Sequence, residues 1–209
     1  MGFGWLLIGY FFVNIMSLYS PLSVIMLVGF PMMIYGLYQL APYHRYFRFS
    51  FYYSFLSLPF AFYFSAYGFS QLFSSLQNTS AFSGALYNGM EWGYFVFSLG
   101  FHLLLLLSIA GLTDELELRS VQSSAWRNLI MVGLYYLIDG FARLPIAWIE
   151  ENRNLFSLSV ILLRLCYVLF NQYLIFQCYR HICPEEDRDM PDPVRKKKPD
   201  AKEEKEHEQ

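Results

Sequence analysis

The chain has 209 residues and a formal net charge of −2, and hydrophobic residues make up 56% of it and aromatic residues 20%. Residues 1–183 carry seven acidic residues and eight arginines but no lysine, whereas residues 184–209 carry ten acidic and seven basic residues. This composition argues against a soluble globular domain of normal size and against a nucleic-acid-binding protein. It predicts an all-α polytopic membrane protein, with a transmembrane domain over residues 1–183 and a disordered, charged cytosolic tail over residues 184–209.

Apolar runs predict a bundle of about six transmembrane helices, because a bilayer-spanning helix needs about 20 residues. In chain order the predicted spans cover residues 3–19, 22–40, 49–67, 92–111, 126–149 and 155–179. The first run lacks the basic start and the small-residue cleavage site of a signal peptide, so we interpret it as a retained helix. Pro31 is expected to kink the second span.

The segment from Gly68 to Glu91 is polar and longer than a turn. Apolar residues recur in it at helical spacing, clearly in its first half and weakly in its second half: Phe69, Leu72, Phe73 and Leu76, then Phe82, Leu86, Tyr87 and Met90. One apolar face on an otherwise polar segment predicts two short helices lying in the membrane interface. A second polar connector is expected over residues 113–124.

Basic residues in the short loops predict the orientation of the chain. With six spans, the N-terminus and the tail lie on one side of the membrane. The arginines of the loop and of the connector lie on that side too: Arg45, Arg48, Arg119 and Arg127. The other side receives only Arg153, next to Glu150 and Glu151. The positive-inside rule therefore predicts cytosolic N- and C-termini in an integral protein of the cell membrane.

Four polar side chains lie inside apolar sequence and form a candidate intramembrane site: Asp139, Arg143, Arg164 and His102. Counted from the polar turn between the last two spans, Asp139 and Arg164 lie at nearly the same depth, so we expect them to pair. Arg143, one helical turn beyond Asp139, is the competing partner, although it could instead extend toward the outer surface. These charges either lock the helices together or serve as a proton relay or anion site.

Glycines recur seven residues apart on three predicted spans: Gly29 and Gly36, Gly93 and Gly100, and Gly133 and Gly140. A seven-residue spacing keeps both glycines on one helix face, where backbones can approach closely. We therefore expect the second, fourth and fifth spans to form a close-packed centre.

No motif indicates catalysis. The sequence has no nucleotide-binding glycine loop, no paired intramembrane aspartates and no histidine or cysteine spacing for a metal, so we predict no catalytic residues, no cofactor and no metal. Two functions remain open. The first is a scaffold or accessory subunit that binds other membrane proteins or a second copy of itself. The alternative is a carrier of a small solute, or a proton-coupled transporter, that uses the polar residues at 102, 139, 143 and 164. A carrier needs these groups to face a water-filled cavity, whereas the scaffold hypothesis predicts that they are shielded from water and bonded to one another.

Overall fold

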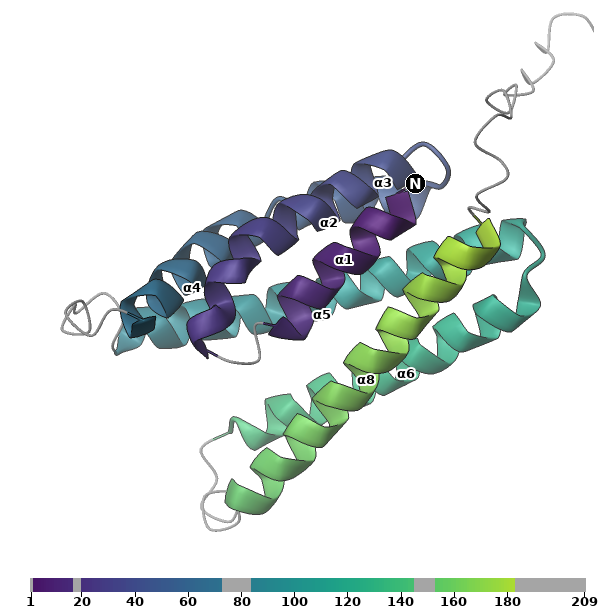
Figure 1. Cartoon of the computed structure of the whole chain (residues 1–209). Helices are drawn as coiled ribbons and strands as arrows, with labels where there is room; N and C mark the ends of the chain where they lie inside the picture. Colours follow the sequence, from purple (N-terminus) through teal and green to yellow (C-terminus); the bar gives the residue numbers. More distant parts are fainter. Residues whose placement is uncertain (1, 17–19, 73–83, 145–152, 183–209) are drawn as a thin grey trace, which may run out of the picture.

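In a computed structural model of the chain, residues 2–16, 20–72, 84–144 and 153–182 are described, and none of them forms a strand (Figure 1). The elements in chain order are α1 (Gly2–Asn14), the 3-10 helix η2 (Ser20–Ile25), α2 (Met26–Leu40), α3 (Arg45–Ser54), α4 (Ser57–Leu72), α5 (Ala85–Glu115), α6 (Arg119–Ala142) and α8 (Arg153–Ile182). The predicted all-α class is therefore confirmed. The tail over residues 184–209, predicted to be disordered, lies outside the described residues.

Three helices among the described residues are long and apolar enough to cross a membrane. They are the 19 residues of Leu22–Leu40, formed by η2 and α2, the 31 residues of α5, and the 27 residues of Phe156–Ile182 in α8. Helix α1 is apolar but has only 13 residues, or about 20 Å of helix. Helix α6 has 24 residues, but they include Arg127, Asn128 and Asp139. The described part of the chain is consistent with an integral membrane protein.

The third predicted span, residues 49–67, is not one continuous helix. Helix α3 ends at Ser54, and α4 begins at Ser57 after a turn at Phe55 and Leu56. Pro59 lies in the first turn of α4, where its missing N–H requires no partner. Proline suits a helix start better than a helix interior, so the apolar run divides there. By contrast, α2 continues through Pro31.

The polar connectors are shorter than predicted, because helices continue into polar sequence. Helix α5 extends beyond the predicted span 92–111 in both directions, so only residues 116–118 separate it from α6. The predicted interfacial helices are not separate elements among the described residues. Phe69 and Leu72 belong to the last turns of α4, and Leu86, Tyr87 and Met90 belong to the first turns of α5. Phe73, Leu76 and Phe82 lie outside the described residues.

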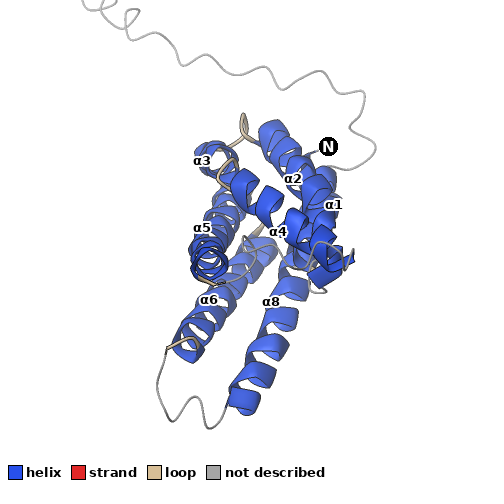
Figure 2. Cartoon of the chain, turned by 90° about the vertical axis from the view of Figure 1, so that its left-hand side faces the viewer, coloured by secondary structure: helices blue, strands red, loops and turns tan. Residues whose placement is uncertain are grey.

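Six helices close a ring. Helix α1 packs against α2 and α8, α2 against α3, α3 against α5, α5 against α6, and α6 against α8 (Figure 2). At one end of the ring, α3 is bonded to α5 through the hydroxyls of Ser50 and Ser108, 3.0 Å apart. At the other end, α4 packs on η2 and also meets α5 through aromatic ring pairs such as Phe64 with Tyr94. Helices α3 and α4 therefore both contact α5, one toward each end of the ring.

The closest helix approach is between α1 and α2, and glycines on both helices permit it. A Cβ built on Gly36 would lie 2.7 Å from the backbone nitrogen of Leu6 and 2.8 Å from the carbonyl oxygen of Gly2. A Cβ on Gly9 would lie 2.7 Å from the carbonyl oxygen of Gly29. The two backbones are thus in contact, which only small residues allow.

The other glycine pairs do not build the predicted centre of the second, fourth and fifth spans. A Cβ on Gly93 or Gly100 of α5 would meet the ring of Phe60 or Tyr53, both outside α6. A Cβ on Gly133 of α6 would meet nothing within 4 Å, and one on Gly140 would reach Phe95 only at 3.5 Å. That expectation was wrong, because the partner of the α2 glycines is α1 with its own seven-residue pair, Gly2 and Gly9.

Candidate functional site

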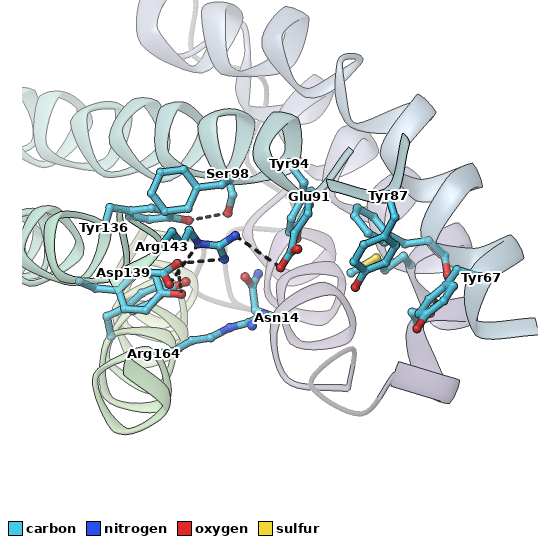
Figure 3. Close-up of a pocket in the computed structure, with 16 residues that line it drawn as sticks. Asn14, Tyr67, Tyr87, Glu91, Tyr94, Ser98, Tyr136, Asp139, Arg143 and Arg164 are labelled. Carbon is cyan, nitrogen blue, oxygen red and sulfur yellow. Dashed lines mark hydrogen bonds and ion pairs between the residues drawn. The ribbon is translucent and has the colours of Figure 1, made fainter. Parts of the chain in front are cut away.

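A cavity of about 220 Å³ lies between α5, α6 and α8 on one side and α1, η2, α2 and α4 on the other (Figure 3). We call it the Arg164 cavity. Its charged lining residues are Glu91, Asp139, Arg143 and Arg164, and its tyrosines are Tyr67, Tyr87, Tyr94, Tyr135, Tyr136 and Tyr167. The remaining lining residues are Asn14, Ser23, Met26, Phe64, Phe95 and Ser98. A cavity of this size and polarity has room for several water molecules or a small organic solute.

Two carboxylates share one arginine along the wall that α5 and α6 provide. Arg143 donates from Nε to Asp139 Oδ1 and from Nη2 to Asp139 Oδ2, both at 3.3 Å, and its Nη1 lies 3.4 Å from Glu91 Oε1. Tyr135 donates its hydroxyl hydrogen to Asp139 Oδ2 at 3.3 Å. We refer to Glu91, Asp139 and Arg143 as the carboxylate cluster.

The position of Arg143 has a local cause. Asp139 and Arg143 are four residues apart on α6, so their side chains lie one above the other on the same face. The Arg143 guanidinium also lies over the Phe95 ring, 5.1 Å from its centroid, and 5.6 Å from that of Trp92. Arg143 is therefore held at the cavity wall by α5, and the predicted alternative in which it extends to the outer surface is wrong.

Arg164 differs from Arg143 in having no such partner. It lines the same cavity, but among the described residues its guanidinium makes no hydrogen bond or ion pair. In Figure 3 its side chain extends from α8 toward Asn14 rather than toward Asp139. The predicted Asp139–Arg164 pair is therefore wrong. Equal depth on neighbouring helices brings two groups to one level, but the partner on the same helix is nearer.

His102 lies deeper than the cavity, in a hydrogen-bonded network. Its Nδ1 donates to the carbonyl oxygen of Ser98 at 2.7 Å, which leaves Nε2 to accept from the Tyr10 hydroxyl at 3.0 Å. Asn171 donates from Nδ2 to the Tyr10 oxygen at 3.2 Å. This network joins α1, α5 and α8 with both imidazole nitrogens bonded, as expected of a residue that locks helices together.

The network and the cavity meet at two residues. Tyr136 donates its hydroxyl hydrogen to Ser98 Oγ at 2.6 Å, and both residues line the cavity. Of the four predicted site residues, Asp139, Arg143 and Arg164 thus line one cavity. His102 does not line it but is bonded to Ser98, which does.

Sequence reasoning missed most of the lining. Glu91 was assigned to the end of a polar connector, yet it reaches Arg143 from the second turn of α5. The sequence analysis assigned no role to Tyr135, Tyr136 and Tyr167, although they lie near Asp139 and Arg164 in the sequence. Phenol hydroxyls close to intramembrane charges were the available signal, because a buried hydroxyl needs a partner.

Within the described residues, no three His, Cys, Asp or Glu side chains gather as metal ligands. Comparisons with protein family models, with curated proteins and with solved structures found no match.

Proposed function

We propose that the chain crosses the cell membrane six times, with both termini in the cytosol. Helix α5 is apolar and has 31 residues, so it is long enough to place Ala85 and Glu115 on opposite sides of the membrane. The closed ring of helices supports six crossings, since α1, the α3–α4 pair and α6 alternate in it with the three long apolar helices. Asn128 and Asp139 of α6 are buried within the bundle rather than facing lipid, and the exposed Arg127 lies in the first half of the helix, toward its connection with α5.

Cysteine labelling of the connections distinguishes six crossings from three. Tyr43 lies between α2 and α3, and Ala85 begins α5. If α3 and α4 together cross the membrane, Tyr43→Cys and Ala85→Cys in a cysteine-free background will react with an impermeant thiol reagent from opposite sides. If only the three long helices cross, both will react from the same side. Glu115→Cys and Leu144→Cys test α6 in the same way, and cells opened by permeabilisation provide the control in which every site reacts.

The function proposed is the binding of a small polar solute in the Arg164 cavity, as a carrier would require. One observation carries it: Arg164, a charge within a predicted span, faces a cavity and pairs with no described residue. A charge inside a bilayer needs a partner or water, so this guanidinium points to a hydrated site with an unfilled position for an anionic group.

The scaffold alternative receives less support. A scaffold expects intramembrane polar groups to be dry and mutually bonded, and the His102 network has that character. The Arg164 guanidinium lacks it, because it lines a cavity and is bonded to no described residue. Helix locking therefore accounts for His102, whereas solute binding accounts for Arg164. The direct test is the accessibility of a thiol at position 164, with position 165 as its control.

A further inference from the structure

The charges around the Arg164 cavity cancel in number but are separated in space. Two carboxylates and two guanidinium groups line it, Glu91 and Asp139 against Arg143 and Arg164. Arg143 contacts both carboxylates, so the carboxylate cluster has a net charge of −1. Arg164 contacts neither carboxylate and supplies +1 by itself. In Figure 3 its side chain ends beside Asn14, and no dashed line joins it to the carboxylate cluster.

We infer that the solute bound in this cavity is a small zwitterion, with an anionic group for Arg164 and a cationic amine for the carboxylate cluster. This inference rests on the proposed solute site and specifies its ligand. A simple anion would satisfy Arg164 but leave the negative charge of the cluster unpaired in the same cavity. A simple cation would have the reverse defect. Only a ligand with both charges complements both walls, and complementary charge placement is what gives a site its specificity.

The residues near Glu91 suit the cationic end of such a ligand. The Glu91 carboxylate lies 3.4 Å from Arg143 and its side chain is 42% exposed, so it keeps acceptor positions for a ligand. Tyr87 and Tyr94 lie four residues before and three residues after Glu91 on α5, so both share its helix face. Phenol rings attract ammonium groups through their faces. The amine is therefore expected between Glu91 and these two rings.

The opposite end suits an anion. A guanidinium has five N–H donors in a planar fork and binds a carboxylate or phosphate through two parallel hydrogen bonds. All donors of Arg164 are free of described protein acceptors, so it can offer this fork without breaking an existing bond. Asn14, toward which Arg164 extends, adds an amide to that end.

A thiol reporter in the cavity wall tests the inference. Met26 lines the cavity from α2, while its neighbour Leu27 is 39% exposed on the outer surface and serves as the control position. In a protein with Cys166, Cys178 and Cys183 changed to serine, the labelling rate of Met26→Cys by a small thiol reagent is measured in detergent with added solutes. We expect at least one ω-amino acid of the series glycine, β-alanine, 4-aminobutyrate and 5-aminovalerate to slow the reaction about tenfold at about ten times its Kd.

Matched solutes decide whether both charges matter. Butyrate and butylamine, each lacking one charge of 4-aminobutyrate, are expected to protect far less than the best amino acid, and Arg164→Gln should abolish that protection. Protection by butyrate equal to that by the amino acids would overturn the zwitterion but leave the solute site intact. Protection by none of the solutes would also overturn it. A Met26→Cys thiol that never reacts, with Phe64→Cys equally silent, would instead contradict the proposed wet cavity.

One further solute separates two sources of the same chemistry. Glycerophosphocholine carries a phosphate and a quaternary ammonium and represents a lipid headgroup in soluble form. Protection by this solute alone would assign the site to a membrane lipid, whereas protection by amino acids alone would assign it to a free metabolite. Both results retain a zwitterion as the ligand. Unchanged thermal stability of the reporter variants confirms that labelling reflects the folded protein.

Discussion

Gly36→Ala is expected to lower the free energy of unfolding of the purified protein by about 3 kcal/mol. The added Cβ would lie 2.7 Å from the nitrogen of Leu6 and 2.8 Å from the carbonyl oxygen of Gly2, and neither is the end of a flexible side chain. Helix α1 must therefore shift away from α2, which loosens the buried contacts of Leu6 and Tyr10 as well.

The matched control is Gly133→Ala on α6, where a Cβ meets nothing within 4 Å. This variant should melt at the same temperature as the parent or slightly above it, because alanine favours a helix more than glycine does. Thermal unfolding of both variants in the same detergent is the measurement. Equal melting temperatures for the two substitutions would mean that α1 and α2 are not in backbone contact.

Asp139→Asn should lower the free energy of unfolding by about 3 kcal/mol, because it leaves the Arg143 guanidinium with the partly exposed Glu91 as its one remaining described carboxylate partner. Arg143→Gln should cost a similar amount, because two carboxylates then face each other without a cation. The double variant is expected to recover at least about 1 kcal/mol of the summed losses.

The same cycle with Arg164 identifies the true partner of Asp139. Asp139→Asn and Arg164→Gln should be additive within about 0.5 kcal/mol, because no ion pair joins them. Both cycles are measured by unfolding in detergent. A coupled Asp139–Arg164 pair with an additive Asp139–Arg143 pair would reverse our assignment of the ion pairs.

The long helices were predictable from the sequence, and their ends were not. The apolar run over residues 92–111 identifies α5, but the helix continues through Glu91 on one side and Asp114 on the other. Polar side chains at helix ends can face water while the backbone keeps its hydrogen bonds, so hydrophobicity does not mark where such a helix stops. The break in the third predicted span has a signal in the sequence, because Pro59 suits a helix start better than a helix interior.

The packing of α1 on α2 was available in the sequence but overlooked. Gly2, just before the first predicted span, and Gly9, within it, repeat the seven-residue spacing of Gly29 and Gly36. Matching patterns on two helices that follow each other in the chain favour direct packing of those two helices. The pairs on later spans look the same in sequence, but Gly133 shows that such a spacing does not by itself require a neighbour.

Three charged residues of the candidate site were predictable from the sequence, whereas their pairing was not. Asp139, Arg143 and Arg164 stand out because charges are rare in apolar sequence, and all three line one cavity. Which arginine pairs with Asp139 depends on helix rotation, which depth along the chain does not give. His102 bonds to Tyr10 across 92 positions of sequence, and no local pattern indicates such a contact.

The most direct test of a hydrated site around Arg164 is thiol labelling of Arg164→Cys in membranes, with Leu165→Cys as the control on the adjacent, outward-facing position. Both are made in the cysteine-free protein and treated with a small hydrophilic thiol reagent. We expect the thiol at position 164 to react readily and the thiol at position 165, facing lipid, to react slowly or not at all. Equal protection of both thiols from the reagent would contradict the account, because a dry Arg164 would leave no cavity in which a solute could bind.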